Sequence, residues 1–276
     1  MNRKMLLLSL PFLAGFLLFY ILPLFYSLYY SAIESAFFPK WVGFQNYIAV
    51  LQNQYYRLAL WNTFEFAWTG VPVLTLVALI LSLLFHGMGG KHGWLRGAFV
   101  LPMLLPSASV VPIFRHFFTD YNSPVQLAML GLGMSQSQIV RVPVYLLYVW
   151  KNVGFNVILL MAALLMIPRD IYEAAALDGA RNFRRFRSIT LPLITPTLFF
   201  VVLMSIVQSL RIFKEAYLLY GAYPDTSIYM VQHYMNNHFF KLNYQNLTSG
   251  GLIFAVIVYL LVLLYYYFER RMDATL

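Results

Sequence analysis

Six long apolar stretches run through the sequence, and they restrict the chain to folds that suit a lipid bilayer. A helix that crosses the hydrocarbon core needs roughly 20 mainly apolar residues. Strands of a transmembrane barrel would alternate apolar and polar residues, whereas these stretches are continuous. The sequence therefore predicts an all-α integral membrane protein with six transmembrane helices. The predicted spans are Leu6–Tyr30, Trp61–Phe85, Leu95–Phe118, Val142–Ile167, Leu191–Leu210 and Gly251–Phe268.

The composition excludes most other classes of protein. Hydrophobic residues make up 61% of the chain and charged residues 11%, against about 45–50% and about 25% in soluble domains. This excludes a disordered chain, and it exceeds the apolar material that one soluble core would use. The absence of cysteine excludes a disulfide framework and thiolate metal sites.

The first apolar stretch also has features of a secretory signal peptide, because Arg3 and Lys4 precede it. However, it is longer than the apolar part of a signal peptide, which has about 7–15 residues. It contains Pro11 and Pro23, and no small-residue cleavage site precedes Tyr29. We therefore expect a retained span.

The basic residues indicate how the chain is oriented. The formal net charge is +9, which in a soluble protein would suggest a nucleic-acid partner. Six spans place both termini on one side of the membrane. Eleven Lys and Arg residues lie on that side, seven lie on the other, and Lys151 lies within the fourth span. Because cytoplasmic loops carry the excess of Lys and Arg, we expect both termini in the cytoplasm and no nucleic-acid partner.

The loop between the fourth and fifth spans, Pro168–Thr190, predicts two short helices. Pro168 suits the first turn of a new helix, where Asp170 and Glu173 interact favourably with the helix dipole. Gly179 is expected to end this helix. The second helix would place an apolar row beside a basic cluster: Phe183, Phe186 and Ile189 in the row, and Arg181, Arg184, Arg185 and Arg187 in the cluster.

Two interpretations of this loop follow from its residues alone. The small alanine side chains after Glu173 would let another backbone approach closely, and the arginines suit an acidic protein surface. An amphipathic segment of this kind could equally rest on anionic lipid. The residues leave both a docking helix and an interfacial helix open.

The same loop resembles a known motif at seven specified positions. Glu173-Ala174-Ala175, Gly179 after three residues, Ile189 after nine and Leu191-Pro192 after one match the EAA motif. This motif is typical of permease subunits of binding-protein-dependent (type I) ABC importers. The resemblance implies that the first helix is a cytoplasmic coupling helix that docks on a separate ATPase subunit. The residues implied in ATPase coupling are Glu173, Ala174, Ala175, Asp178, Gly179, Ala180 and Arg184.

Weaker similarities extend along most of the chain and resemble the carbohydrate branch, the maltose-type sugar permeases. The matching segments are Gly43–Tyr47, Asn62-Thr63, Leu101-Pro102, Pro106, Trp150, Gly154 and Gly221–Thr226. The sequence lacks the long periplasmic domain and additional spans of the enterobacterial maltose subunit, so functions of those parts are not implied. A permease for a non-sugar solute is the alternative.

The resemblance also implies an organisation and a set of partners. Residues 1–276 would form a single transmembrane permease domain, with a five-span core over 60–268 and the coupling loop over 168–190. The partners would be a second, related permease subunit, two cytoplasmic ATPase subunits, an extracytoplasmic solute-binding protein and a carbohydrate substrate. The chain would lie in the bacterial cytoplasmic membrane. It would bind no cofactor itself, and ATP and Mg would bind to the ATPase.

Polar residues in the fourth and fifth spans are candidates for a translocation pathway, because polar groups at membrane depth normally face the bundle interior. Asn152 and Asn156 share a helix face, and Gln208, Arg211 and Glu215 would form a second stripe. As alternatives, the amides could join helices and Lys151 could extend to the outer surface. The candidates are Lys151, Asn152, Phe155, Asn156, Gln208, Arg211 and Glu215.

Other transporter and enzyme classes have less support. A secondary transporter would predict internal repeats, broken spans and membrane-buried carboxylates, yet only Glu65 lies clearly inside a span, where we expect it to pair with a basic residue. An intramembrane enzyme would need paired acids, a histidine cluster or a nucleophile–base pair, and we expect no catalytic or metal-binding residues. We expect His233 and His238 to lie at the surface. The sequence contains no phosphate-binding loop.

Overall fold

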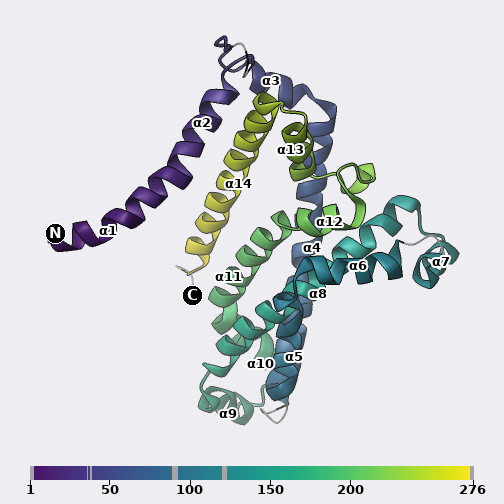
Figure 1. The fold of residues 1–276 in the computed structure, drawn as a ribbon. Helices are drawn as coiled ribbons and strands as arrows, with labels where there is room; N and C mark the ends of the chain where they lie inside the picture. Colours follow the sequence, from purple (N-terminus) through teal and green to yellow (C-terminus); the bar gives the residue numbers. More distant parts are fainter. Residues whose placement is uncertain (1–2, 36, 38, 89–92, 120–122, 274–276) are drawn as a thin grey trace. The chain divides into compact units, whose positions relative to one another are not determined.

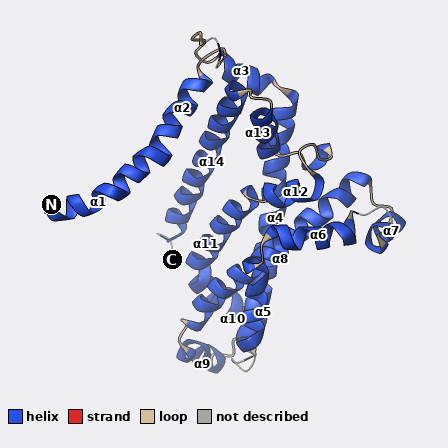
Figure 2. Cartoon of the chain, viewed as in Figure 1, coloured by secondary structure: helices blue, strands red, loops and turns tan. Residues whose placement is uncertain are grey.

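The computed structural model describes residues 3–35, 37, 39–88, 93–119 and 123–273, which form helices joined by turns (Figure 1). These residues contain no β-strand, and one isolated bridge joins Ile33 to Trp41 (Figure 2). Lys91, one of the cations predicted in the cytoplasm, lies outside the described residues. The chain divides into two compact units: residues 1–60 with 230–260, and residues 61–229 with 261–276.

Among the described residues, five helical segments are long and apolar enough to cross a membrane, or up to six if one bent pair counts as a span. Spans one, two, four, five and six are therefore confirmed. The first consists of α1 (Arg3–Phe16), the π-helix η1 (Leu17–Ile21) and α2 (Leu22–Ser31). The others are α4 (Gln54–Gly87), α8 (Gln136–Leu165), α11 (Leu191–Leu210) and α14 (Tyr244–Asp273).

The third predicted span is not one straight helix. It consists of α5 (Gly93–Leu104) and α6 (Ser107–Phe118), which are bent by 97° relative to each other. Pro106 has no N–H to donate and disfavours a helical conformation at Leu105. The backbone at Pro106 itself is extended, with φ of −60° and ψ of 133°, so the chain leaves the helical conformation here. The predicted third span, Leu95–Phe118, is therefore present as two helices with a break at this proline.

In the first unit, the segment Gly43–Tyr47 ties α3 (Gln45–Gln52) to the end of α2. Asn46 Nδ2 donates to the carbonyl oxygens of Ser31 at 3.0 Å and Ile33 at 2.8 Å. The hydroxyls of Tyr47 and Ser31 lie 2.6 Å apart. This segment therefore has a structural role that explains its residue pattern.

The buried centre of the first unit is aromatic. The rings of Tyr56 in α4 and Tyr234 in α13 (Val231–Phe240) are buried with centroids 5.0 Å apart, and the Tyr56 hydroxyl donates to the Gly250 carbonyl at 2.7 Å. His233 is also buried, so its predicted surface position was wrong. Its Nδ1 accepts the Met230 N–H at 3.1 Å, which satisfies a donor at the start of α13. Burial lowers the pKa of His233 to about 4.

In the second unit, α8 packs against both α5 and α11. Tyr148 of α8 is buried and donates its hydroxyl to the Ser205 carbonyl of α11 at 2.7 Å. On the α5 side, a Cβ added at Gly154 would lie 1.8 Å from the Phe99 carbonyl oxygen. The backbones of α5 and α8 are therefore in direct contact.

The unit also contains α7 (Pro124–Gly131), α9 (Arg169–Leu177), α10 (Asn182–Arg185), the π-helix η2 (Phe186–Thr190), α12 (Phe213–Tyr220) and the 3-10 helix η3 (Thr226–Ile228).

We expect Gly154→Ala to lower the unfolding temperature of the detergent-purified protein, because α5 and α8 would have to separate. Overpacking of this kind costs about 1–3 kcal/mol and occasionally more. Gly97→Ala is the matched control, since Gly97 lies in α5 and an added Cβ there meets nothing within 4 Å. Equal unfolding temperatures for the two variants, measured by scanning fluorimetry, would contradict this account of the packing.

Candidate functional site

Lys151 and Glu215 form a largely buried ion pair in the second unit. Lys151 Nζ lies 2.8 Å from Glu215 Oε1, and the two side chains are only 15% and 10% exposed. Ser107, the first residue of α6, donates to Glu215 Oε1 at 2.7 Å and accepts from Lys151 Nζ at 2.6 Å. This charge cluster therefore joins α8, α12 and α6 immediately after the break in the third span.

The structure decides one alternative and corrects one expectation for these residues. Lys151 has a carboxylate partner within the protein, Glu215, and its side chain is only 15% exposed, so the alternative in which it extends to the outer surface does not hold. The stripe of Gln208, Arg211 and Glu215 does not lie on one helix, because α11 ends before Arg211 and α12 begins after it. Arg211 is exposed in the intervening turn, whereas Glu215 is buried. Ser107 was not identified from the sequence as a member of this cluster. Its position directly after Pro106 could have indicated that it begins a new helix.

Amide side chains lie where α8 packs against α11. Asn156 is fully buried and its Nδ2 donates to Ser205 Oγ at 2.8 Å, so the alternative of an interhelical hydrogen bond is confirmed. Within the described residues, Asn156 Oδ1 and Gln208 Oε1 accept no hydrogen bond. Asn152 Nδ2 donates to a carbonyl of its own helix at 2.7 Å, and Phe155 is half-buried. Two buried amide oxygens thus retain unused acceptor capacity.

Glu65 pairs with Arg141, which confirms that it has a basic partner. Arg141 Nη1 donates to Glu65 Oε1 at 2.6 Å, and Nη2 donates to Oε2 at 3.1 Å. This fork geometry is the stronger form of an arginine–carboxylate pair. The two residues are 76 positions apart, so no local spacing could have named the partner.

The helix predicted after the fourth span is present as α9, and Gly179 terminates it as expected. The Ala180 N–H donates to the Ala175 carbonyl at 2.9 Å, and the Gly179 N–H donates to the Ala176 carbonyl at 3.1 Å. This pair of bonds is the Schellman motif. Gly179 has φ of +74°, a conformation that costs other residues about 1–2 kcal/mol. Glu173 is exposed on the same helix.

The second predicted helix of the loop is present in a modified form. The short α10 is followed by the π-helix η2, which continues into α11 without a break. Phe183 is 73% exposed, so the expected apolar row is not buried as a whole, while Phe186 and Ile189 are half-buried. The remaining predicted coupling residues are exposed (Ala174, Asp178 and Arg184) or half-buried (Ala175 and Ala180).

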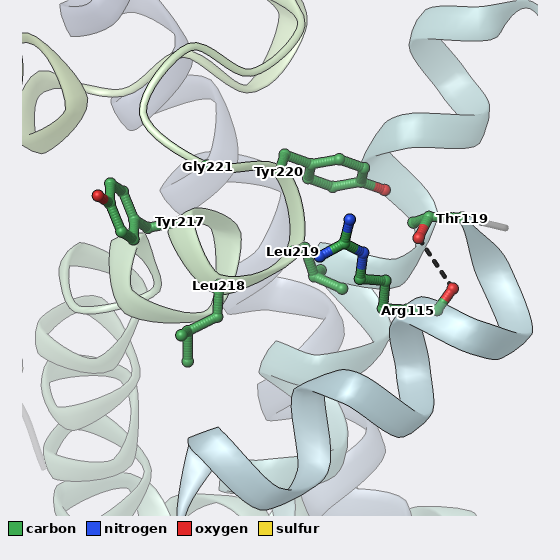
Figure 3. Close-up of a pocket in the computed structure, with 7 residues that line it drawn as sticks. All are labelled: Arg115, Thr119, Tyr217, Leu218, Leu219, Tyr220 and Gly221. Carbon is green, nitrogen blue, oxygen red and sulfur yellow. Dashed lines mark hydrogen bonds between the residues drawn. The ribbon is translucent and has the colours of Figure 1, made fainter.

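A pocket of about 480 Å³ lies where α6 and α12 end (Figure 3). Arg115 and Thr119 line one side, and Thr119 Oγ1 donates to the Arg115 carbonyl at 2.8 Å. Residues Tyr217–Gly221 form the other side. Guanidinium donors and carbonyl acceptors suit hydroxyl-bearing groups, but none of the predicted pathway residues lines this pocket. Among the described residues, no group of His, Asp and Glu side chains could hold a metal ion.

Comparison with known proteins identifies the family. Residues 60–274 match the family described as "Binding-protein-dependent transport system inner membrane component". The chain belongs to this family. A relative within it is the trehalose/maltose transport system permease protein MalF of Thermococcus litoralis, 30% identical over 264 residues, which cover 91% of this chain and 86% of the relative. The arabinooligosaccharides transport system permease protein AraP of Bacillus subtilis is 30% identical over 220 residues, which cover 76% of this chain and 70% of that relative.

A solved structure shares the fold of this permease. It comes from a bacterial ABC transporter involved in the import of the acidic polysaccharide alginate, with a TM-score of 0.82 and 23% identity over 98% of this chain and 96% of that one. The family match and the relatives confirm the expected resemblance to ABC importer permeases. The chain is a membrane transport subunit of the permease type and not an enzyme.

We expect Glu215→Gln to lower the unfolding temperature of the permease strongly, because it leaves the Lys151 ammonium without its charged partner. Breaking a buried ion pair costs about 3–5 kcal/mol, and replacing both partners by apolar residues is often nearly neutral. The double variant Lys151→Met, Glu215→Leu should therefore recover most of the loss.

Glu65→Gln is the matched control for this experiment. Its pair with Arg141 is about twice as exposed, at 28% and 30%, and should contribute less than the buried pair. Thermal unfolding of the four proteins checks the ranking. A Glu215→Gln variant as stable as the wild type would show that the cluster does not hold α6, α8 and α12 together.

Proposed function

We propose that this permease is the membrane-spanning subunit of an ATP-driven importer of a sugar or oligosaccharide, forming the translocation pathway and coupling it to a separate ATPase subunit. The observation that carries the proposal is α9, a helix with an exposed Glu173 that ends at Gly179 inside a family match over residues 60–274. The exposed surface of α9 is suited to contact with another protein.

The substrate proposal rests on the relatives. Their names specify trehalose and maltose, arabinooligosaccharides, and sulfoquinovosyl glycerol. A permease for a non-sugar solute is the second candidate, because another relative is named for sn-glycerol 3-phosphate. Polyhydroxylated solutes are common to these names, and they need hydrogen-bond acceptors as well as donors along their path.

The proposed assembly contains a second, related permease subunit, two cytoplasmic ATPase subunits and an extracytoplasmic solute-binding protein. A structure that matches this chain with a TM-score of 0.79 includes an alginate pentasaccharide-bound periplasmic protein, which supports the last partner. The chain would lie in the bacterial cytoplasmic membrane with both termini in the cytoplasm. ATP and Mg would bind to the ATPase, and this chain would bind no cofactor.

The proposed coupling contact uses the EAA segment. Exposed Ala174 and half-buried Ala175 would allow close approach of the ATPase backbone, and Glu173 would pair with a donor on it. Gly179 and its neighbours Asp178 and Ala180 form the turn that presents the helix, and exposed Arg184 would face an acidic surface.

The proposed pathway uses the polar residues of α8 and the α11–α12 region. Asn156 Oδ1 and Gln208 Oε1 have acceptor capacity for sugar hydroxyls, and Asn152 and Phe155 lie on the same helix as Asn156. Arg211 is exposed and can donate to solute. The charge cluster would position α8 and α12 around the pathway without contacting the solute.

We expect Gly179→Asp to abolish coupled uptake while the subunit still inserts in the membrane, because the left-handed turn and the presentation of α9 would be lost. The measurement is ATP-dependent sugar uptake and solute-stimulated ATPase activity of the reconstituted importer. Gly133→Asp is the matched control, since Gly133 has φ of +76° and equally open surroundings but lies in another loop. Fully coupled uptake in the Gly179→Asp importer would refute the proposed function.

We expect Asn156→Ala to raise the KM for uptake of sugar delivered by the solute-binding protein, because a hydrogen-bonding amide is removed from the pathway. Ser205→Ala is the control for the structural part of the effect, since it removes the partner of Asn156 Nδ2, together with a bond to the Val201 carbonyl within α11, and keeps the amide. A KM for Asn156→Ala no higher than that for Ser205→Ala would exclude solute contact at this amide.

A further inference from the structure

A single side-chain hydrogen bond joins α9 to the base of the fifth span. The hydroxyl of Tyr172, next to Glu173, lies 2.9 Å from Thr190 Oγ1. Thr190 is 5% exposed and is the last residue of the π-helix η2, immediately before α11. In the described part of the chain, Tyr172 is the only residue of α9 whose side chain forms a hydrogen bond.

The other attachments of α9 are extended connections. Pro168, before α9, has ψ of 138°, and Arg181, after the Gly179 turn, has ψ of 164°. Neither residue continues a helix, so α9 is joined to α8 through residues 166–168 and to α10 through residues 178–181, and each connection includes an extended residue. A helix held only at such ends can pivot when it is pushed. The bond from Tyr172 to Thr190 supplies a third attachment, which opposes this rotation.

Thr190 is placed to pass a displacement into the transmembrane region. The helical path from α10 through η2 into α11 is unbroken, so Thr190 moves with the start of the fifth span. Short π-helical turns inside helices often mark functional sites. Further along, α11 is fixed to α8 by the Tyr148–Ser205 and Asn156–Ser205 hydrogen bonds. A force on α9 therefore has a continuous route to the amides of the proposed pathway.

We propose that Tyr172 and Thr190 are positioning residues whose hydrogen bond makes α9 move as one body with the fifth span, so that nucleotide-driven displacement reaches the pathway. This inference rests on the proposed contact between α9 and the ATPase. The bond touches neither solute nor nucleotide. Its loss reduces the number of solute molecules imported per ATP hydrolysed and leaves assembly intact.

The test uses the full importer reconstituted with its ATPase and solute-binding protein. Tyr172→Phe removes one oxygen and keeps the ring, and Thr190→Val removes the hydroxyl from the other side. A net hydrogen bond corresponds to a change of between about twofold and tenfold in an equilibrium. We expect each variant to lower uptake per ATP within that range, with ATPase activity and unfolding temperature close to wild type.

Three further variants separate coupling from general structure. Thr190→Ser keeps the hydroxyl and should retain wild-type coupling. The double variant Tyr172→Phe, Thr190→Val should be no worse than either single variant, because both remove the same bond. Tyr47→Phe is the matched control, since its hydroxyl lies 2.6 Å from the Ser31 hydroxyl in the first unit, and it should leave coupling unchanged.

A cross-link distinguishes failure of this inference from failure of the proposed function. The chain has no cysteine, so Ala176→Cys places one thiol on the exposed part of α9, where a photoactivatable reagent can capture the ATPase. Capture that persists in Tyr172→Phe while uptake per ATP falls supports the link. Capture with unchanged uptake per ATP overturns the link alone. No capture in the importer that carries Ala176→Cys alone overturns both the proposed function and the link. Equal loss of coupling in Thr190→Ser and Thr190→Val overturns the link alone.

Discussion

Backbone groups within a bilayer have no water to satisfy them, so any interruption of a spanning helix must be compensated by neighbouring groups. Pro106 creates such an interruption between α5 and α6, and the charge cluster of Lys151, Glu215 and Ser107 lies directly beyond it. Because the cluster includes one residue from each of α6, α8 and α12, it fixes the position of α8. The packing against α5 and α11 depends on that position.

The sequence predicted those elements whose cause is local. Long apolar runs identified five spans closely, and Pro168 and Gly179 marked the helix that became α9. The break in the third span was not predictable in the same way. Pro72 and Pro143 lie inside continuous helices, whereas Pro106 ends one. Each of these prolines lies in an apolar stretch. Whether the helix continues or ends there depends on whether neighbouring helices can satisfy the freed backbone groups.

Partners distant in the sequence account for what could not be predicted at the candidate site. Lys151 was placed by counting residues along a span, but its position is set by Glu215, 64 residues away. Ser205 sits within an apolar run and becomes informative only when Asn156 donates to it. His233 has no revealing neighbour in sequence, yet it is buried near the start of α13, where its Nδ1 accepts the Met230 N–H. The family assignment was possible because the EAA motif is contained within one loop.

The contact between Gly154 and Phe99 has a consequence for how α5 and α8 can move. It is made by backbone atoms, which cannot change rotamer, so no side-chain rearrangement can shorten or lengthen it. Any change in the angle between these helices must therefore occur by rotation about this point. Gly154 is three residues from Lys151, less than one helical turn. Small rotations there leave the charge cluster nearly in place and displace the far ends of both helices most.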